Sequence, residues 1–408
     1  MPRSAADLLA SRLIKVVVDL GMSNTWYAFA PSMLGQNTAV DFAARALILH
    51  HEPKSVQAIV PYEVPSYTAY RIALNHLRVS LDASDFSLMT TGLLGLYEML
   101  RKDHLAALHT HAQGVSAVIK AHLAEGRPAS PVVRAALYSN TVMTFARPLL
   151  MGVASPFDKP EWLELDPAAV QSLQTPIVKL SKIAHQIALR IPRLIAITRR
   201  LRQSAAPEID TITNARLIAD KIFALKDYSS EDELLRTVKL LPSTRPVGNP
   251  LDTDFFLFDS VPARDTMLMY WTARLIIVKL GLVLCDIQRR NDPLSDAQSS
   301  KIKLEHEQAG LLLCVLMCWN NGFGHVNVFN ILWSALMGRK DVRGHDAQSI
   351  RTWIMWQHEA ELSGWGFKYG PEHADVDADV LAGGPLEGSH LQWFREIGLI
   401  PSADRGGV

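Results

Sequence analysis

The chain has 408 residues, of which 48% are apolar, and its 41 Lys and Arg residues balance 41 Asp and Glu residues. This composition is typical of a globular protein, and the zero net charge excludes the broad basic field by which proteins bind nucleic acids or anionic membranes. The three cysteines, Cys285, Cys314 and Cys318, lie in apolar stretches, which favours a reducing compartment over a disulfide-stapled scaffold.

Residues 1–38 are predicted to form one amphipathic helix and a lead-in to the next helix. Leu9, Leu13, Val16 and Val17 recur at spacings of three and four, which is the period of a helix with one buried face. Charged side chains interrupt the apolar part of this segment, so we expect a packed helix rather than a secretory signal peptide.

Residues 39–241 are predicted to form the first helical half of a larger domain. Apolar residues keep the helical spacing there, for example at Tyr70 and Ala73. Ser84 or Asp85 is placed to cap the next helix, because the short polar side chains of Ser and Asp accept hydrogen bonds from the first free N–H groups.

The clearest break in the sequence is PSTRPVGNPLDTD at residues 242–254, which is rich in residues that favour turns. We predict that it is a hinge between two helical halves. The second half spans residues 255–363 and contains the helical pair Leu268 and Trp271. Residues 364–408 are glycine-rich and lean acidic, so we predict an irregular tail.

The stretch Ala309–Gly338 contains no Asp, Glu, Lys or Arg and is long enough to cross a membrane. The polar sequence NNGFGH at residues 320–325 interrupts its middle, and unpaired amides are costly in hydrocarbon. We therefore predict two buried helices joined by a turn.

The helical period runs through almost the whole chain, and alternation with a period of two is hard to find. We predict an all-α fold, an irregular array of packed helical hairpins without a significant β-sheet.

Patterns typical of enzymes are short in this chain. His373 and Asp377 form an H-x-x-x-D pattern, which in acyltransferases supplies a general base and a structural carboxylate. Asn291 and Asp292 resemble the beginning of a magnesium-binding set in terpene cyclases, but Ser299 stands where a carboxylate is needed. We predict no catalytic residue, no cofactor-binding residue and no metal ligand, and the His373 and Asp377 pair is the alternative.

The most prominent basic cluster is a helical run that contains Arg199, Arg200 and Arg202. Apolar residues alternate with these arginines, which is typical of a helix with one solvated face. Short arginine-rich runs also serve in nuclear import and in phosphate binding, so the three arginines are candidates for either role.

Five stretches follow one another in a fixed order along the chain. They are YTAYRIALNHL (67–77), LLGLYEML (93–100), HTHAQGVSAVI (109–119), SPFDKPEWLEL (155–165) and FFLFDSVPARDTMLMYWTARLII (255–277). In this order, from about residue 39 to about residue 360, they resemble the fungal-specific regulatory domain found downstream of the binuclear zinc cluster in fungal transcription factors. The matched positions, among them Tyr97, Glu98, Gly114, Trp162 and Trp271, are expected to pack helices together.

The resemblance implies a non-catalytic regulator of transcription, located in the nucleus and controlling a biosynthetic gene set. The family's DNA-binding module needs six cysteine thiolates around two zinc ions, whereas this chain has three cysteines in all. We therefore expect action through other transcription factors, co-regulators or a small effector, without direct DNA contact by this chain, unless an upstream segment carries the zinc cluster. The alternatives are an all-α biosynthetic enzyme and a non-catalytic adaptor outside the nucleus.

Overall fold

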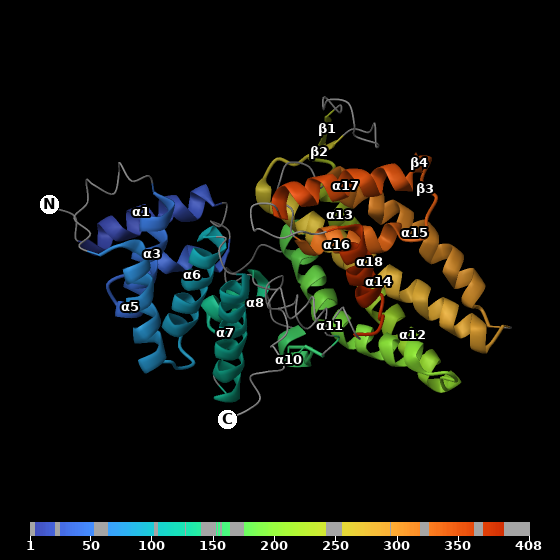
Figure 1. The fold of residues 1–408 in the computed structure, drawn as a ribbon, viewed down its shortest axis with the longest axis horizontal. Coiled ribbons are helices and arrows are strands. Elements are labelled where there is room, and N and C mark those ends of the chain that lie inside the picture. Colours follow the sequence, from blue (N-terminus) through green and yellow to red (C-terminus); the bar gives the residue numbers. More distant parts are fainter. Residues whose placement is uncertain are drawn as a thin grey trace. The chain divides into compact units, whose positions relative to one another are not determined.

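The computed structural model describes residues 5–20, 25–52, 64–101, 105–126, 128–139, 152, 154–155, 157–163, 175–241, 255–293, 295–318, 326–362 and 370–386. Within these ranges the regular structure is almost entirely helical, and the strands form two short antiparallel pairs (Figure 1). The prediction of an all-α fold is confirmed. The chain divides into two compact units, Met1–Thr144 with Leu391–Val408 and Phe145–His390.

The first unit is a bundle around helix α6. Its described elements are α1 (Ala5–Asp19), the 3-10 helix η1 (Trp26–Phe29), α2 (Ala30–Met33), α3 (Thr38–His51), α5 (Ser66–Val79), α6 (Asp85–Arg101), α7 (Leu105–Ala124) and α8 (Pro131–Ser139). Helix α6 packs against α3, α5, α7 and α8, and every residue from Ser87 to Glu98 is buried. A helix that is apolar around its whole circumference belongs at the centre of a core.

Local signals in this unit agree with the sequence. The hydroxyl of Ser84 accepts a hydrogen bond from the N–H of Ser87 at 3.2 Å, so Ser84 caps α6. The predicted apolar face of α1, from Leu9 to Val17, is buried. Gly92 in α6 lies directly against Trp26, where an added Cβ atom would meet the indole ring at 2.1 Å.

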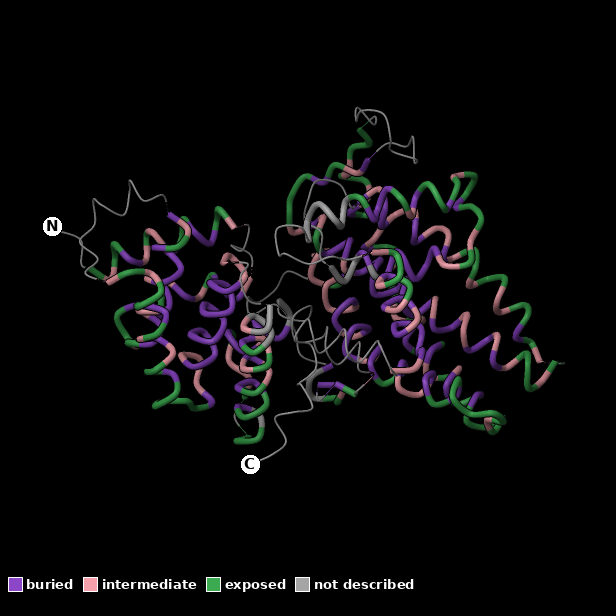
Figure 2. The backbone as a smooth tube through the Cα atoms, in the orientation of Figure 1, coloured by how far each residue is buried: buried purple, intermediate pink, exposed green. Residues whose placement is uncertain are grey.

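The second unit is built around helix α14. Its described elements are α10 (Pro160–Leu163), α11 (Pro176–Gln203), α12 (Ile209–Phe223), α13 (Tyr228–Leu235), β1 (Lys239–Leu241), β2 (Phe255–Leu257), α14 (Val261–Asn291), α15 (Ala297–Cys318), α16 (Val326–Leu336), β3 (Asp341–Val342), β4 (His345–Asp346), α17 (Ala347–Leu362) and α18 (Pro371–Leu381). Helix α14 packs against α11, α12, α15 and α16, and buried residues line the inner sides of these helices (Figure 2).

Helix α14 is long and apolar enough to cross a membrane by length and composition alone, but 78% of its apolar window is buried inside the unit. Such burial is typical of a core helix. The charge-free stretch Ala309–Gly338 contributes two helices, because α15 ends at Cys318 and α16 begins at Val326. The prediction of two helices is confirmed, and the predicted turn at residues 320–325 lies outside the described residues.

The chain does not divide at the predicted hinge, residues 242–254. Strands β1 and β2 flank this segment and pair with each other, so that Leu241 lies opposite Phe255. The helices before it and after it pack together, α11 and α12 against α14, and the units divide instead between Thr144 and Phe145. Prolines and glycines predict a loop whether it lies within one unit or between two units. The packing of the helices on its two sides decides which of these it is.

The prediction of an irregular tail from residue 364 was wrong for residues 371–381, which form helix α18. Pro371 stands at the first turn of α18, where its missing N–H costs nothing. Ala374, Ala378 and Leu381 are buried, and α18 packs against α16. Burial of this face stabilises a helix whose glycine-rich surroundings favour a loop.

Candidate functional site

A cleft of about 240 Å³ lies in the second unit among helices that are far apart in the sequence. Helices α11, α14 and α18 supply its charged residues, which are Arg202, Lys279, Asp286, Arg290 and Asp379. Its apolar lining comes from α14, from the end of α16 and from α18, and consists of Val283, Ile287, Met337, Ala378 and Ala382. This volume is below the roughly 300 Å³ at which ordinary ligand pockets begin, so only a small molecule would fit.

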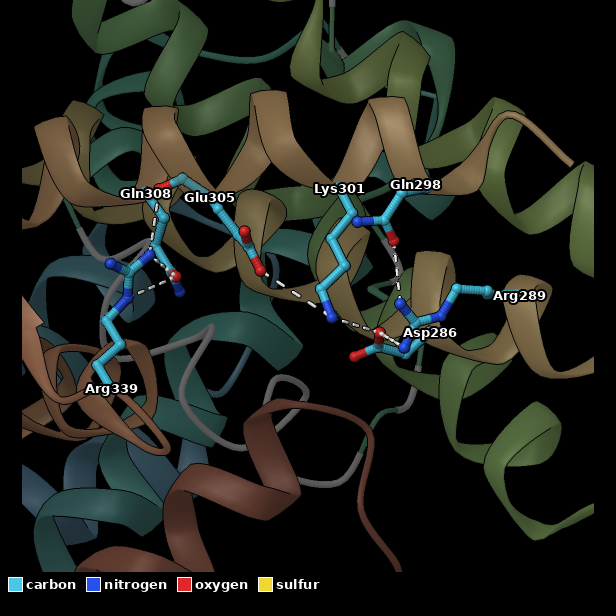
Figure 3. Close-up of polar contacts among 7 residues, drawn as sticks. All are labelled: Asp286, Arg289, Gln298, Lys301, Glu305, Gln308 and Arg339. Atoms are coloured by element: carbon cyan, nitrogen blue, oxygen red, sulfur yellow. Dashed lines mark hydrogen bonds and ion pairs between the residues drawn. The ribbon is translucent and has the colours of Figure 1, made fainter. Parts of the chain in front are cut away.

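Both carboxylates in the cleft already have cationic partners. Asp379 accepts a hydrogen bond from Arg202 at 2.9 Å. Asp286 accepts one from Lys301 of α15 at 2.7 Å, and Arg289 lies 3.9 Å from the same oxygen (Figure 3).

The remaining two cations of the cleft are not neutralised in this way. Within the described part of the chain, neither Lys279 nor Arg290 forms an ion pair. The lining therefore holds three cations and two carboxylates, an excess of one positive charge. A net positive charge in a concave site with apolar walls attracts anionic ligands.

Lys279 lies on α14 and lines this cleft. Burial lowers the pKa of its ammonium group below the usual value, and the nearby cations Arg339 and Arg202 act in the same direction. Asp379 and Asp286 oppose this shift by favouring the charged form. Arg339 is held beside the cleft by Gln308 of α15, whose side-chain oxygen accepts a hydrogen bond from it at 2.6 Å (Figure 3).

The three arginines predicted from the sequence lie in different environments. Arg199 is buried, and its Nε donates to the carbonyl of Gly384 at 2.7 Å. Arg202 reaches the cleft, where it binds Asp379. Arg200 is exposed. Arg199 therefore holds the chain after α18 in place rather than facing a phosphate or an import receptor, because docking of α18 covers that side of α11.

The alternative catalytic pair lies on α18, and neither residue lines the cleft. His373 Nδ1 accepts a hydrogen bond from the N–H of Gly370 at 3.0 Å, which caps the helix. Asp377 is 1% exposed. The terpene-cyclase-like Asn291 donates its side-chain N–H to the carbonyl of Ile287 at the end of α14. Over the described ranges, no group of three His, Cys, Asp or Glu side chains is placed to hold a metal ion.

A second charged cluster in this unit surrounds Arg274, which is 1% exposed. Its guanidinium lies over the rings of Phe223, Tyr228 and Tyr270 at 5.4 to 5.5 Å, and it bonds to Glu307. The aromatic rings thus enclose a cation that belongs to the protein itself. This cluster ties α12, α13, α14 and α15 together.

The sequence reasoning missed Lys279, Arg290 and Asp379. Lys279 carried the one usable signal, because it is the single charge in the apolar run from Leu275 to Cys285. A single lysine in a core helix needs an anionic partner, a lowered pKa or access to a cavity, because an isolated buried charge is costly. Asp379 gave no signal, since its partner Arg202 is 177 residues away.

No family model matches the chain, and comparison with curated proteins and with solved structures finds no similar protein. The structure itself therefore defines the class, a helical protein of two units with a charged cleft in the second. The family resemblance stays a prediction.

Proposed function

We propose that this chain is a non-catalytic regulator of transcription in the nucleus and that a small organic anion bound in the cleft controls it. The observation that carries this proposal is the cleft itself, in which Lys279 and Arg290 face an apolar lining. The ordered resemblance of the sequence to a fungal regulatory domain supports the transcriptional role. A ligand with one acidic group and a small apolar body matches both kinds of surface.

Ligand binding is coupled to the position of α18. An anion in the cleft competes with Asp379 for Arg202, and Asp379 lies on α18. The same end of α18 is held by Arg199 through the carbonyl groups of Val380 and Gly384. Release of Asp379 from Arg202 would loosen α18, and the change in α18 is the signal to a partner protein in this proposal.

Calorimetric titration of the full chain with benzoate tests the site. Benzoate carries one carboxylate and one apolar ring. Lys279→Met should weaken its binding by roughly tenfold or more, because a hydrogen bond to a charged group contributes about 1.5–3 kcal/mol. Lys303→Met is the matched control, since Lys303 is exposed on α15 and does not line the cleft. Equal affinity in all three proteins would contradict the site.

The transcriptional role needs a separate test in the organism that encodes the chain. A tagged copy should accumulate in the nucleus, and deletion should change the transcripts of a defined gene set. A copy that carries Lys279→Met should still accumulate in the nucleus. The transcripts of that gene set should then no longer respond to the small anion as they do with the native protein. A cytoplasmic tagged copy together with unchanged transcripts would favour an adaptor instead.

A further inference from the structure

The amine of Lys279 differs from the other lysines near the cleft. Together with Leu275 and Ile276 on its own helix and Ile331, Ser334 and Leu381 on α16 and α18, it lines a second, smaller cavity. Lys279 also lines the cleft and forms no ion pair among the described residues. Lys301, by contrast, donates to Asp286 at 2.7 Å and lies 4.0 Å from Glu305.

Charged groups from α11, α14 and α18 and from the chain after α16 lie near Lys279. They are Arg202 of α11, Asp286 and Arg290 of α14, Arg339 after α16, and Asp379 of α18. Asp379 and Asp286 favour the charged form of Lys279, but each already accepts a hydrogen bond from another cation, Arg202 or Lys301. Burial and the neighbouring arginines lower the pKa of Lys279, so it holds a larger share of neutral, nucleophilic amine than a free lysine at the same pH.

We propose that Lys279 binds the carbonyl group of a small anionic aldehyde or ketone as a reversible imine, while Arg290 and Arg202 hold the acidic group of the same molecule. This inference rests on the proposed function, in which the cleft takes an organic anion. It defines the ligand class further as an oxo acid or a formyl acid with a small apolar body.

The chemistry balances without any other reactant. The nitrogen lone pair of Lys279 attacks the carbonyl carbon and forms the C–N bond. Both hydrogens of the amine move to the carbonyl oxygen, which leaves as water when the C–O bond breaks. The product is a C=N double bond between Lys279 and the ligand, and nothing is oxidised or reduced. Water reverses the reaction, as a reversible effector requires.

The test uses para-formylbenzoate, which carries an aldehyde and a carboxylate on one ring. The full chain is incubated with this compound and sodium cyanoborohydride near pH 7, and peptides are then analysed by mass spectrometry. We expect Lys279 to be labelled faster than Lys303, because burial lowers the pKa of Lys279 and a lower pKa leaves more free amine at the same pH. Labelling spread evenly over exposed lysines would overturn the proposal.

Two controls separate this inference from the anion site itself. The Lys279→Arg variant cannot form the imine, so it should lose the label. The compound para-(hydroxymethyl)benzoate lacks the carbonyl, so it should bind the native chain without labelling it and slow the labelling by para-formylbenzoate. Binding of benzoate without selective label at Lys279 would refute the imine and leave the proposed function standing. Failure of both binding and labelling would refute both.

Discussion

Trp271 lies at the centre of α14 and combines burial with a polar contact. It is 0% exposed, its ring centroid is 5.8 Å from that of Phe256, and its Nε1 donates to Glu231 of α13 at 2.6 Å. Trp271→Ala leaves a cavity in a site that is closed on all sides, and the expected cost is about 3–5 kcal/mol of unfolding free energy. Trp271→Phe keeps a ring in the core but removes the donor to a carboxylate, for an expected cost of about 1.5–3 kcal/mol.

The two variants differ further in their pH dependence. Burial raises the pKa of Glu231 above 4.5, and the hydrogen bond from Trp271 and the charge of Arg274 oppose that rise. A carboxyl whose pKa is raised by folding binds more protons in the native state, so stability falls as the pH rises through the interval above 4.5. Trp271→Phe removes a contact that lowers this pKa. The cost of Trp271→Phe should therefore be larger at neutral pH than near pH 4.

Guanidinium unfolding of the full chain, followed by far-ultraviolet circular dichroism, measures these free energies. Hydrogen exchange on peptides from α14 assigns the loss to the second unit. The unfolding midpoint should move to lower denaturant in both variants, further in Trp271→Ala. A cost below about 1.5 kcal/mol for Trp271→Ala would show that the indole is not a core residue, since full burial of a large side chain does not allow so small a loss.

Three further predictions concern packing, titration and the arginine cluster. Gly92→Ala should destabilise the first unit by about 1–3 kcal/mol or more in thermal unfolding, because its Cβ would overlap Trp26, and a native melting temperature would contradict this packing. Burial lowers the pKa of His111 to about 4, so the unfolded state binds the proton first as the pH falls below about 6.5. The free energy of unfolding of the first unit should fall by up to roughly 3 kcal/mol between pH 6.5 and pH 4. His111→Gln should remove most of this fall, and an unchanged fall in that variant would show that another group causes it. Arg199→Ala should cost about 1–3 kcal/mol and speed hydrogen exchange in α18, whereas the exposed Arg200→Ala should stay within about 0.5 kcal/mol; equal effects would show that Arg199 does not hold α18.

The helices could be predicted because their signals are local. The spacing of Leu9, Leu13 and Val16 and the cap at Ser84 act within one or two turns, and the structure has helices at both places. The composition of residues 242–254 predicted a break between helices, but the prediction of a hinge between two halves was wrong. The composition of a loop carries no information about whether the helices on its two sides pack together. Helix α18 was missed because its stability comes from burial against α16 rather than from its own residues.

The amino-acid sequence by itself determined that this protein is helical, that its charge is balanced and that Trp271 belongs to a core position. Tertiary structure alone decided where the two units divide, that Arg199 is buried while Arg200 is exposed, and that Lys279 meets Asp379 in one cleft. The physical reason is the distance along the chain over which each kind of interaction acts. Helix periods and caps act over a few residues. The side chains of a site, by contrast, become neighbours only after the helices have packed.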